Sequence, residues 1–296
     1  MLEKALMFFF AAKVALVTCH YEAGHAGLEK QKMKVERAGT LDRTLDECSG
    51  ICPSPWSDHL LALNDSGGKA EIYEITREGK LVNTHPVPGA VNRDWEEITT
   101  DDAGNVYIGD FGNNSNTRKD LTIYKYTKRG SGDASAPDAS SAGSTAGQAF
   151  PDITQKITFR YAGQTFAGGE KREFDCEAFF WANDSLYLFT KSWEKGAKTC
   201  RMYVLPDRPG DYEVSARDEV LLKAQITGAA LRPDKKQFAL ISYGKIFLFN
   251  IPGEQIGFRS PHACIKIARK QTEAIMFEGT DQLLFTNEQR GMFRIK

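Results

Sequence analysis

The stretch Asp94-Trp95-Glu96-Glu97-Ile98-Thr99, followed by Val106-Tyr107-Ile108-Gly109-Asp110, decides the fold class. Both runs are rich in β-branched, aromatic and apolar residues, which favour strands. Between them, Asp102-Ala103-Gly104-Asn105 provides residues that tolerate a positive φ and therefore a tight turn. The stretch is predicted to be a β-hairpin whose second strand ends on a carboxylate.

The same strand–turn–strand–loop–strand unit occurs five times along the chain. Each copy opens on an acidic or hydroxyl residue, here called the repeat head, and the five repeat heads are Ser49, Glu97, Glu177, Thr227 and Glu273. Their positions are separated by 48, 80, 50 and 46 residues. Repeats of about 45 to 50 residues with several strands each are typical of a β-propeller. The chain is therefore predicted to be all-β.

The long separation contains Arg129 to Ala149, a stretch rich in Ser, Ala, Gly and Asp without a hydrophobic pattern. Such a composition buries little apolar surface, so a disordered insertion is expected at about 129–150. Without it the four separations are similar, which predicts five blades, with six as the alternative. The last repeat has three strands, and a strand near Val35 would complete its blade and close the ring. The propeller is expected over residues 33–296.

The N-terminus is typical of an exported protein. A short charged start precedes the mostly apolar run Ala5 to Val17, as in a secretory signal. Leu16-Val17-Thr18-Cys19 resembles the lipobox of bacterial lipoproteins, with Cys19 as the acylated residue. Residues 1–19 are thus interpreted as a signal or lipoprotein-like segment and 20–32 as a polar tether; an amphipathic N-terminal segment is the alternative. The expected location is periplasmic, on the outer surface as a lipoprotein, or secreted, with membrane contact only through a lipid on Cys19.

Charge and cysteine content exclude two classes of function. The chain has 296 residues, 26% of them charged, and a net charge of -1, which is unlike the basic surface of a nucleic-acid-binding protein. The 6 cysteines show no zinc-finger spacing with His or Cys partners. An exported chain could form one or two disulfides among them, and the spacing leaves the pairing open.

The repeat heads are predicted to form a metal site. The innermost strand of each blade lines the channel of a propeller, so pseudo-symmetry would direct Ser49, Glu97, Glu177, Thr227 and Glu273 toward one axis. Carboxylates that close repel one another unless a cation lies between them. An all-oxygen ligand set of this kind suits Ca²⁺ better than Mg²⁺. The alternative is a water-filled channel whose glutamates bind neighbouring backbone amides.

Repeat heads in the order Ser, Glu, Glu, hydroxyl, Glu resemble those of the calcium-activated nucleotidase (apyrase) family. The resemblance covers roughly residues 46–296 and depends on the repeat heads and the blade pattern. It implies a five-bladed propeller with one axial Ca²⁺ and hydrolysis of nucleoside diphosphates and triphosphates. Three segments, Asn64 to Gly68, Asp94 to Glu97 and Gly109 to Asn114, also resemble exported bacterial propellers of unassigned function.

A second set of polar residues ends the second strands: Asp65, Asp110, Lys191, Ser242 and Asn287. These ends should lie near one mouth of the channel, beside Arg93, Trp95, Arg118 and Trp193. For phosphoanhydride hydrolysis, Asp65 or Asp110 would orient water, and Arg93, Trp95, Arg118 and Lys191 would bind the substrate. The alternative is that the Asp and Asn residues cap turns and that Trp95 is wedged between blades.

Two functions fit these patterns. The first is a Ca²⁺-dependent phosphoanhydride or phosphoester hydrolase that acts on a small phosphate ester. The second is a non-catalytic surface propeller with a structural ion that binds a glycan, peptide or protein. The second is favoured by the lack of a recognisable nucleophile, base dyad or phosphate loop.

Overall fold

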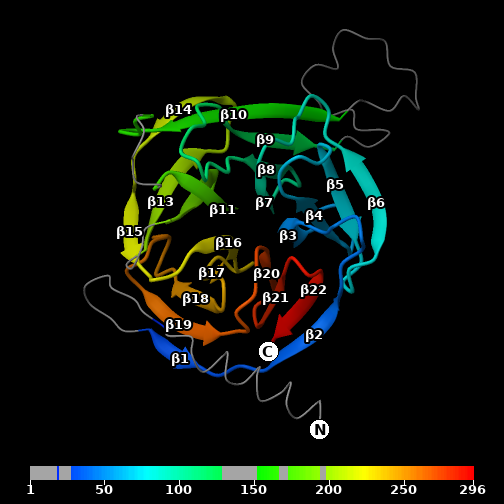
Figure 1. The fold of residues 1–296 in the computed structure, drawn as a ribbon, viewed down its shortest axis with the longest axis vertical. Helices are drawn as coiled ribbons and strands as arrows, with labels where there is room; N and C mark the ends of the chain where they lie inside the picture. Colours follow the sequence, from blue (N-terminus) through cyan, green and yellow to red (C-terminus); the bar gives the residue numbers. More distant parts are fainter. Residues whose placement is uncertain (1–18, 20–27, 129–151, 167–172, 194–197) are drawn as a thin grey trace.

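A computed structural model describes residues 19, 28–128, 152–166, 173–193 and 198–296. Five β-sheets stand around a central axis and form a five-bladed propeller (Figure 1). The five blades predicted from the repeat are confirmed. The described part of the chain contains no α-helix, and hence none that could cross a membrane. The predicted insertion at about 129–150 and the signal segment 1–18 lie outside the described residues.

The blades are numbered one to five in chain order, and in each the strands run outward from the axis. Blade one has β3 (Cys48–Pro53), β4 (Leu60–Asn64), β5 (Glu71–Ile75) and β6 (Leu81–Pro86). Blade two has β7 (Trp95–Thr100), β8 (Val106–Asp110), β9 (Leu121–Thr127) and β10 (Ile153–Tyr161). Blade three has β11 (Asp175–Ala182), β12 (Ser185–Lys191), β13 (Thr199–Pro206) and β15 (Asp218–Leu221). Blade four has β16 (Ile226–Leu231), β17 (Gln237–Ser242), β18 (Lys245–Asn250) and β19 (Pro261–Lys266).

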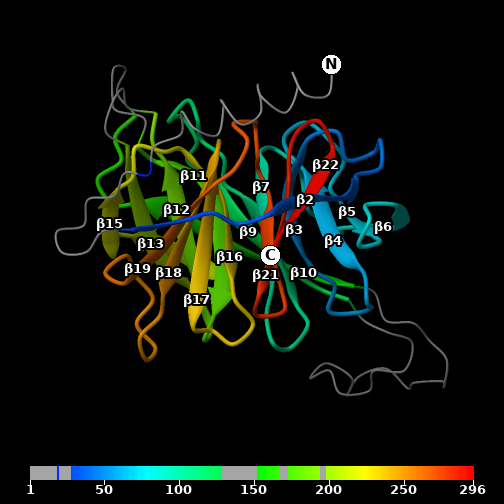
Figure 2. The same ribbon diagram turned by 90° about the horizontal axis from the view of Figure 1, so that it is seen from below.

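The N-terminal part of the chain closes the ring. Blade five consists of β20 (Ile275–Glu278), β21 (Gln282–Thr286), β22 (Gly291–Ile295) and β2 (Val35–Thr40). Strand β2 pairs antiparallel with β22, so Val35 lies opposite Ile295 as expected from the missing strand. Just before it, β1 (Glu29–Gln31) pairs parallel with β19 of blade four. The expected tether thus contains a strand, and β1 and β2 run along the outside of the ring (Figure 2).

Apolar packing between neighbouring blades holds the ring together. Successive side chains of a strand point to opposite faces of its sheet, and here each face meets another blade. All five residues of β8 are therefore buried. One hydrophobic cluster fills each blade–blade contact; for example, Phe180 of blade three packs against Phe238 of blade four, with ring centroids 5.7 Å apart. Sheets covered on both faces explain why the strands read as nearly continuous apolar runs.

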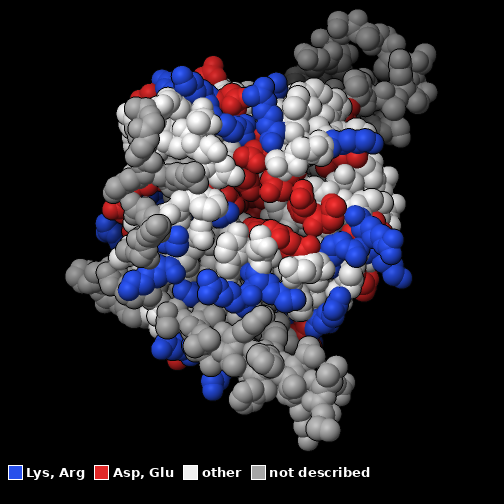
Figure 3. Space-filling model, viewed as in Figure 1, with Lys and Arg blue, Asp and Glu red and all other residues white. Residues whose placement is uncertain are grey.

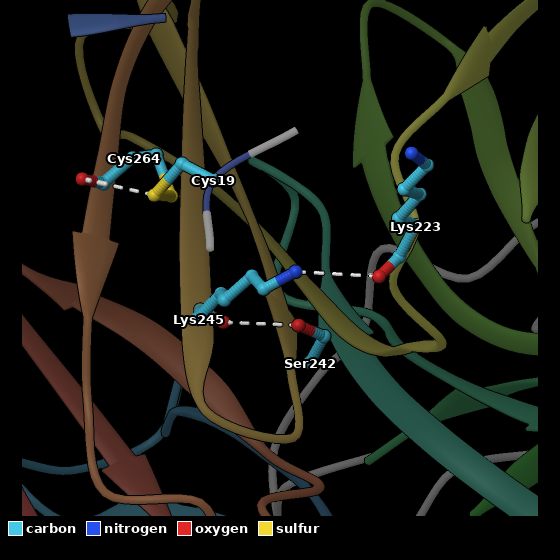
Figure 4. Close-up of a disulfide and its surroundings, with 5 residues drawn as sticks. All are labelled: Cys19, Lys223, Ser242, Lys245 and Cys264. Carbon is cyan, nitrogen blue, oxygen red and sulfur yellow. Dashed lines mark hydrogen bonds between the residues drawn. A yellow bond between two sulfur atoms is a disulfide. The ribbon is translucent and has the colours of Figure 1, made fainter. Parts of the chain in front are cut away.

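A disulfide fastens the N-terminal segment to blade four. Cys19 is bonded to Cys264 of β19, with the Cα atoms 6.1 Å apart (Figure 4). Four further cysteines, Cys48, Cys52, Cys176 and Cys200, are buried and carry free thiols. Acylation of Cys19 and this disulfide require the same sulfur, so one molecule can have only one of them.

Candidate cation-binding cavity

A β-bulge begins the innermost strands and sets the direction of the repeat heads. The ladders shift register between Cys48 and Gly50, Trp95 and Glu97, Cys176 and Ala178, and Ile226 and Gly228. A bulge leaves one residue unpaired and redirects its side chain. The unpaired residues are Ser49, Glu96, Glu177 and Thr227. Glu273 takes the corresponding place in blade five, one residue before Ala274, whose carbonyl accepts a hydrogen bond from Thr286.

Glu96, rather than the predicted Glu97, is therefore equivalent to the other repeat heads. Glu97 is fully buried between inner strands, where its carboxylate accepts hydrogen bonds from the backbone N–H groups of Ile98 at 3.0 Å and Ala229 at 3.2 Å. Burial raises the pKa of Glu97 well above its usual range. The bond from Ala229 joins β7 to β16, as expected from the alternative in which the channel glutamates bind backbone amides. The role of Glu97 as an axial ligand stays a prediction, and this geometry does not favour it.

An acidic cavity of about 420 Å³ opens at the end of the channel where the innermost strands begin. Figure 3 shows Asp and Glu side chains gathered around the centre of this face. Eight carboxylates line the cavity: Asp46, Glu47, Asp65, Asp94, Glu96, Glu177, Glu273 and Glu288. Among the described lining residues, Lys191 is the one cation. Acidic groups thus far outnumber basic ones in the cavity, which favours positively charged ligands.

Three of these carboxylates converge on one small volume. Ligand oxygens of Asp65, Asp94 and Glu96 all lie within 4.8 Å of one another. Glu96 is only 8% exposed, and no hydrogen bond or ion pair from the described residues reaches its carboxylate. A Cβ at Gly112 would lie 2.1 Å from Glu96 Oε1 and 2.4 Å from Asp94 Oδ2. The absence of a side chain at residue 112 therefore makes room for both acids.

Burial and mutual repulsion make this cluster costly to ionise. Burial, then the charges of Glu177 and Asp65, raise the pKa of Glu96 well above its usual range. The same causes, burial first and then the charge of Asp65, raise the pKa of Asp94 to about 6. Burial also raises the pKa of Asp65. A cation between the three groups would remove this penalty, because it favours the charged form of each carboxyl.

The other acidic heads already have partners. Lys191 Nζ lies 2.9 Å from Glu177 Oε2, and both side chains are less than a tenth exposed. The hydroxyl of Tyr243 donates to Glu273 Oε1 at 3.1 Å, while burial raises the pKa of Glu273 to about 7. The sequence-predicted cluster is therefore partly assembled: Ser49, Asp65, Glu177, Lys191 and Glu273 line one cavity together with Trp193.

The two hydroxyl heads are bonded to backbone. Ser49 Oγ donates to the carbonyl of Trp95 at 2.9 Å, and Thr227 Oγ1 donates to the carbonyl of Thr272 at 2.6 Å. Thr227 is buried and does not line the cavity, so its predicted role as a metal ligand stays a prediction.

Four other predicted residues lie outside the cavity lining. Asp110 is buried and paired with Arg118 at 2.9 Å, and it also accepts the N–H of Asp94. Arg118 further binds the carbonyls of Gly112 and Asp110, which fixes the loop that carries Gly112. Arg93 pairs with the exposed Asp120. Trp95 is fully buried between blades, and its indole N–H donates to the carbonyl of Val91, as in the structural alternative. Catalysis by Asp110 and substrate binding by Arg93, Trp95 and Arg118 stay predictions.

Sequence reasoning did not select Asp94 and Glu96. Both lie in the stretch 94–99, where the repeat pattern predicts Glu97 as the repeat head. The signal that could have found them is the alternation around Trp95: a fully buried aromatic residue places its two neighbours on the opposite face of the strand. Asp175 was also missed; its carboxylate accepts the N–H of Asn113 at 2.7 Å and the indole N–H of Trp193 at 2.6 Å.

Comparisons with known proteins do not assign this chain to a family. No protein family matches the sequence, and no curated protein matches it. Among solved structures, a PQQ-bound aldose sugar dehydrogenase from Streptomyces coelicolor aligns over 91% of this chain and 99% of its own, at 10% identity and a TM-score of 0.49. The WD40 repeats of RRP9 align over 93% of this chain and 99% of their own, at 8% identity and a TM-score of 0.42. An inactive virginiamycin B lyase from Staphylococcus aureus aligns over 84% and 66% respectively, at 13% identity and a TM-score of 0.36.

Proposed function

We propose that this protein is an exported binding propeller whose acidic cavity holds a Ca²⁺ ion at Asp65, Asp94 and Glu96. The observation that carries the proposal is Glu96, a nine-tenths buried carboxylate without a hydrogen-bond partner among the described residues, aimed at two further carboxylates. A largely buried carboxylate beside two other carboxylates is costly to ionise in a folded protein. A bound cation supplies the missing compensation.

The donor set favours Ca²⁺ among common cations. The described lining residues offer carboxylate, amide and hydroxyl oxygens, and no His or Cys that would favour Zn²⁺. Ca²⁺ accepts six to eight oxygens in flexible geometry, and three carboxylates supply between three and six of them. The remainder would be waters or oxygens of a bound ligand. When bound, the ion would supply a positive centre that attracts anionic or hydroxyl oxygens into an otherwise negative cavity.

A binding role fits the surroundings better than nucleotide hydrolysis. A phosphate group entering this cavity meets carboxylates on most sides, and Lys191 is already paired with Glu177. Arg93 and Arg118, which would bind phosphate charge, are paired with Asp120 and Asp110 outside the lining. The ligand would be a glycan, peptide or protein that reaches the ion with oxygen atoms and packs against Trp193, whose side chain is partly exposed at the cavity.

A Ca²⁺-dependent phosphoester hydrolase is the second candidate, and Glu273 is the observation that favours it. Burial raises its pKa to about 7, close to the value that suits a general base at neutral pH. The hydrolase predicts Ca²⁺-dependent phosphate release from nucleoside diphosphates that Glu273→Gln abolishes. The binding propeller predicts no release with any phosphate ester.

Export is supported by the bond between Cys19 and Cys264, since disulfides persist in oxidising compartments. In an exported protein with this disulfide, Cys19 has no free thiol that a lipid could modify. A lipid-anchored protein would therefore be a different molecular form that lacks the disulfide. Intact-mass measurement of the protein purified from its native envelope separates the two forms.

Thermal unfolding of the whole chain with Ca²⁺ and with a chelator tests the ion site. An ion that binds only the folded state stabilises it by about 2.7 kcal/mol at 100 times its Kd. Glu96→Gln and Asp94→Asn should abolish the Ca²⁺-dependent rise in Tm. The matched control is Glu97→Gln, one residue away but outside the cavity, which should lower the Tm in both conditions and keep the rise. A rise that survives Glu96→Gln, or an absence of any rise in the unmodified protein, contradicts the proposed site.

A further inference from the structure

Lys191 places a buried ammonium group in the lining of the acidic cavity. It ends β12 of blade three and is 6% exposed. Its Nζ lies 2.9 Å from Glu177 Oε2, 5.0 Å from the ring centroid of Trp193 and 5.8 Å from that of Tyr243. A carboxylate and two aromatic faces around one ammonium are the contacts expected of a bound cation.

The position of Lys191 in its blade is one that reaches the cavity in other blades. Lys191 follows Thr190, which pairs with Cys176 just before the bulge. In blade one the residue paired just before the bulge is Asn64, and in blade four it is Ser242. The next residues along the chain, Asp65 and Tyr243, both line the cavity. Blade one therefore contributes an anion to the proposed Ca²⁺ site at the place where blade three contributes a cation.

Two repeat heads, Glu177 and Glu273, stabilise the charged form of Lys191. Burial by itself would lower the pKa of Lys191, yet its pKa is raised, because Glu177, Tyr243 and Glu273 favour the charged form. In return, the ammonium favours the ionised form of both glutamates, whose pKa values burial raises. Removing one partner of such a buried pair leaves an uncompensated charge, which is strongly destabilising.

We propose that Lys191 is the resident axial cation of this propeller: its ammonium occupies the place between Glu177 and Glu273 that a divalent ion would otherwise take. The cavity then holds one divalent ion, at Asp65, Asp94 and Glu96, and Lys191 is the residue that excludes a second. The count of one ion rests on the proposed function, whereas the exclusion of an axial ion by Lys191 does not.

The stoichiometry of Ca²⁺ binding to the whole chain, measured by isothermal titration calorimetry, tests this proposal. Lys191→Met removes the charge with little change in length, and the number of bound ions should rise from one to two. Lys191→Arg, which keeps a cation, should leave one ion. Lys191→Met combined with Glu96→Gln should bind one ion, now on the axis. Lys191→Met that binds the same number of ions as the unmodified protein overturns the proposal.

Folding of the variant gives a second readout. Because Ca²⁺ should replace the lost ammonium, Lys191→Met should be destabilised in chelator and rescued by Ca²⁺ in thermal unfolding. Loss of the fold in both conditions also contradicts the proposal. The two proposals fail separately: an unmodified protein that binds no ion, together with a Lys191→Met variant that binds one, rejects the Asp65–Asp94–Glu96 site and supports the role of Lys191.

Discussion

The two ends of the channel are made by the same innermost strands and have opposite chemistry. At the beginning of these strands, eight carboxylates line a cavity of about 420 Å³. At their far end, a second cavity of about 230 Å³ is lined mainly by apolar side chains, among them Ile98, Phe180, Leu231 and Phe277. The bulges account for the difference, because they interrupt the regular alternation only where the strands begin. The proposed ion site thus lies at the acidic end, whereas the apolar end contributes packing.

The largest expected effect comes from the apolar end. Phe180 is 2% exposed and packs against Phe189, Phe238 and Tyr187. Phe180→Ala should lower the free energy of unfolding by about 3 to 5 kcal/mol, since it removes buried area and leaves a cavity. Urea denaturation measures this loss. The Ca²⁺-dependent rise in Tm should remain, and its disappearance in this variant would show that the two ends are not independent.

The acidic end should respond to pH instead. The folded-state pKa is about 6 for Asp94 and about 7 for Glu273, above the values of unfolded carboxyl groups. The folded state therefore binds more protons between pH 5 and 7, and the free energy of unfolding must fall as pH rises through this range. After allowance for the solvent exposure of Asp94, we expect a change on the order of 1 to 3 kcal/mol in chelator.

Calcium should reduce this pH dependence, because the ion favours the ionised form of its proposed ligand Asp94. The part that comes from Glu273, which is not a proposed ligand, should remain. Urea denaturation at pH 5, 6 and 7, with Ca²⁺ and with chelator, provides the measurement. Glu96→Gln should retain a pH response from Glu273 while losing the effect of Ca²⁺. Stability that rises with pH in chelator would mean that the acids of this cavity are not costly to ionise.

The same contrast explains what the sequence could predict. Strands, blade number and ring closure follow from hydrophobic runs and turn residues, which are local, so the hairpins and the pairing of Val35 with the last blade were predicted correctly. The choice between Glu96 and Glu97 depends on a bulge, and one extra residue exchanges the two faces of a strand. Periodicity does not locate such an insertion, although the alternation around the buried Trp95 places Asp94 and Glu96 on one face of the strand.

Contacts between residues distant in the sequence could not be predicted either. The ion pair of Lys191 with Glu177 depends on burial and on the register of β11 against β12, which charge patterns alone do not give. Strand β1 pairs in parallel with the outer edge strand β19, and β14 (Gly210–Val214) pairs in parallel with the outer edge strand β10. Both pairs join segments that become neighbours only when the ring assembles. Identifying the cavity therefore required the structure, although three of its acids, Asp65, Glu177 and Glu273, were predicted from the sequence.

The smallest expected effect lies within the acidic cavity and tests which partner, Tyr243 or Lys191, keeps Glu273 ionised. Tyr243 donates a hydrogen bond to Glu273 Oε1 at 3.1 Å, which lowers the pKa of that carboxyl against the larger effect of burial. Tyr243→Phe keeps the ring beside Lys191 and removes the donor, so it should destabilise the protein by about 0.5 to 1.5 kcal/mol at pH 8. The loss should shrink as pH falls below 7, because a protonated Glu273 needs the donor less. Proton NMR of the Glu273 side chain would show its titration moving to higher pH. A loss of stability that is equal at pH 5 and pH 8 would instead assign Tyr243 a packing role and leave Lys191 as the main partner that keeps Glu273 ionised.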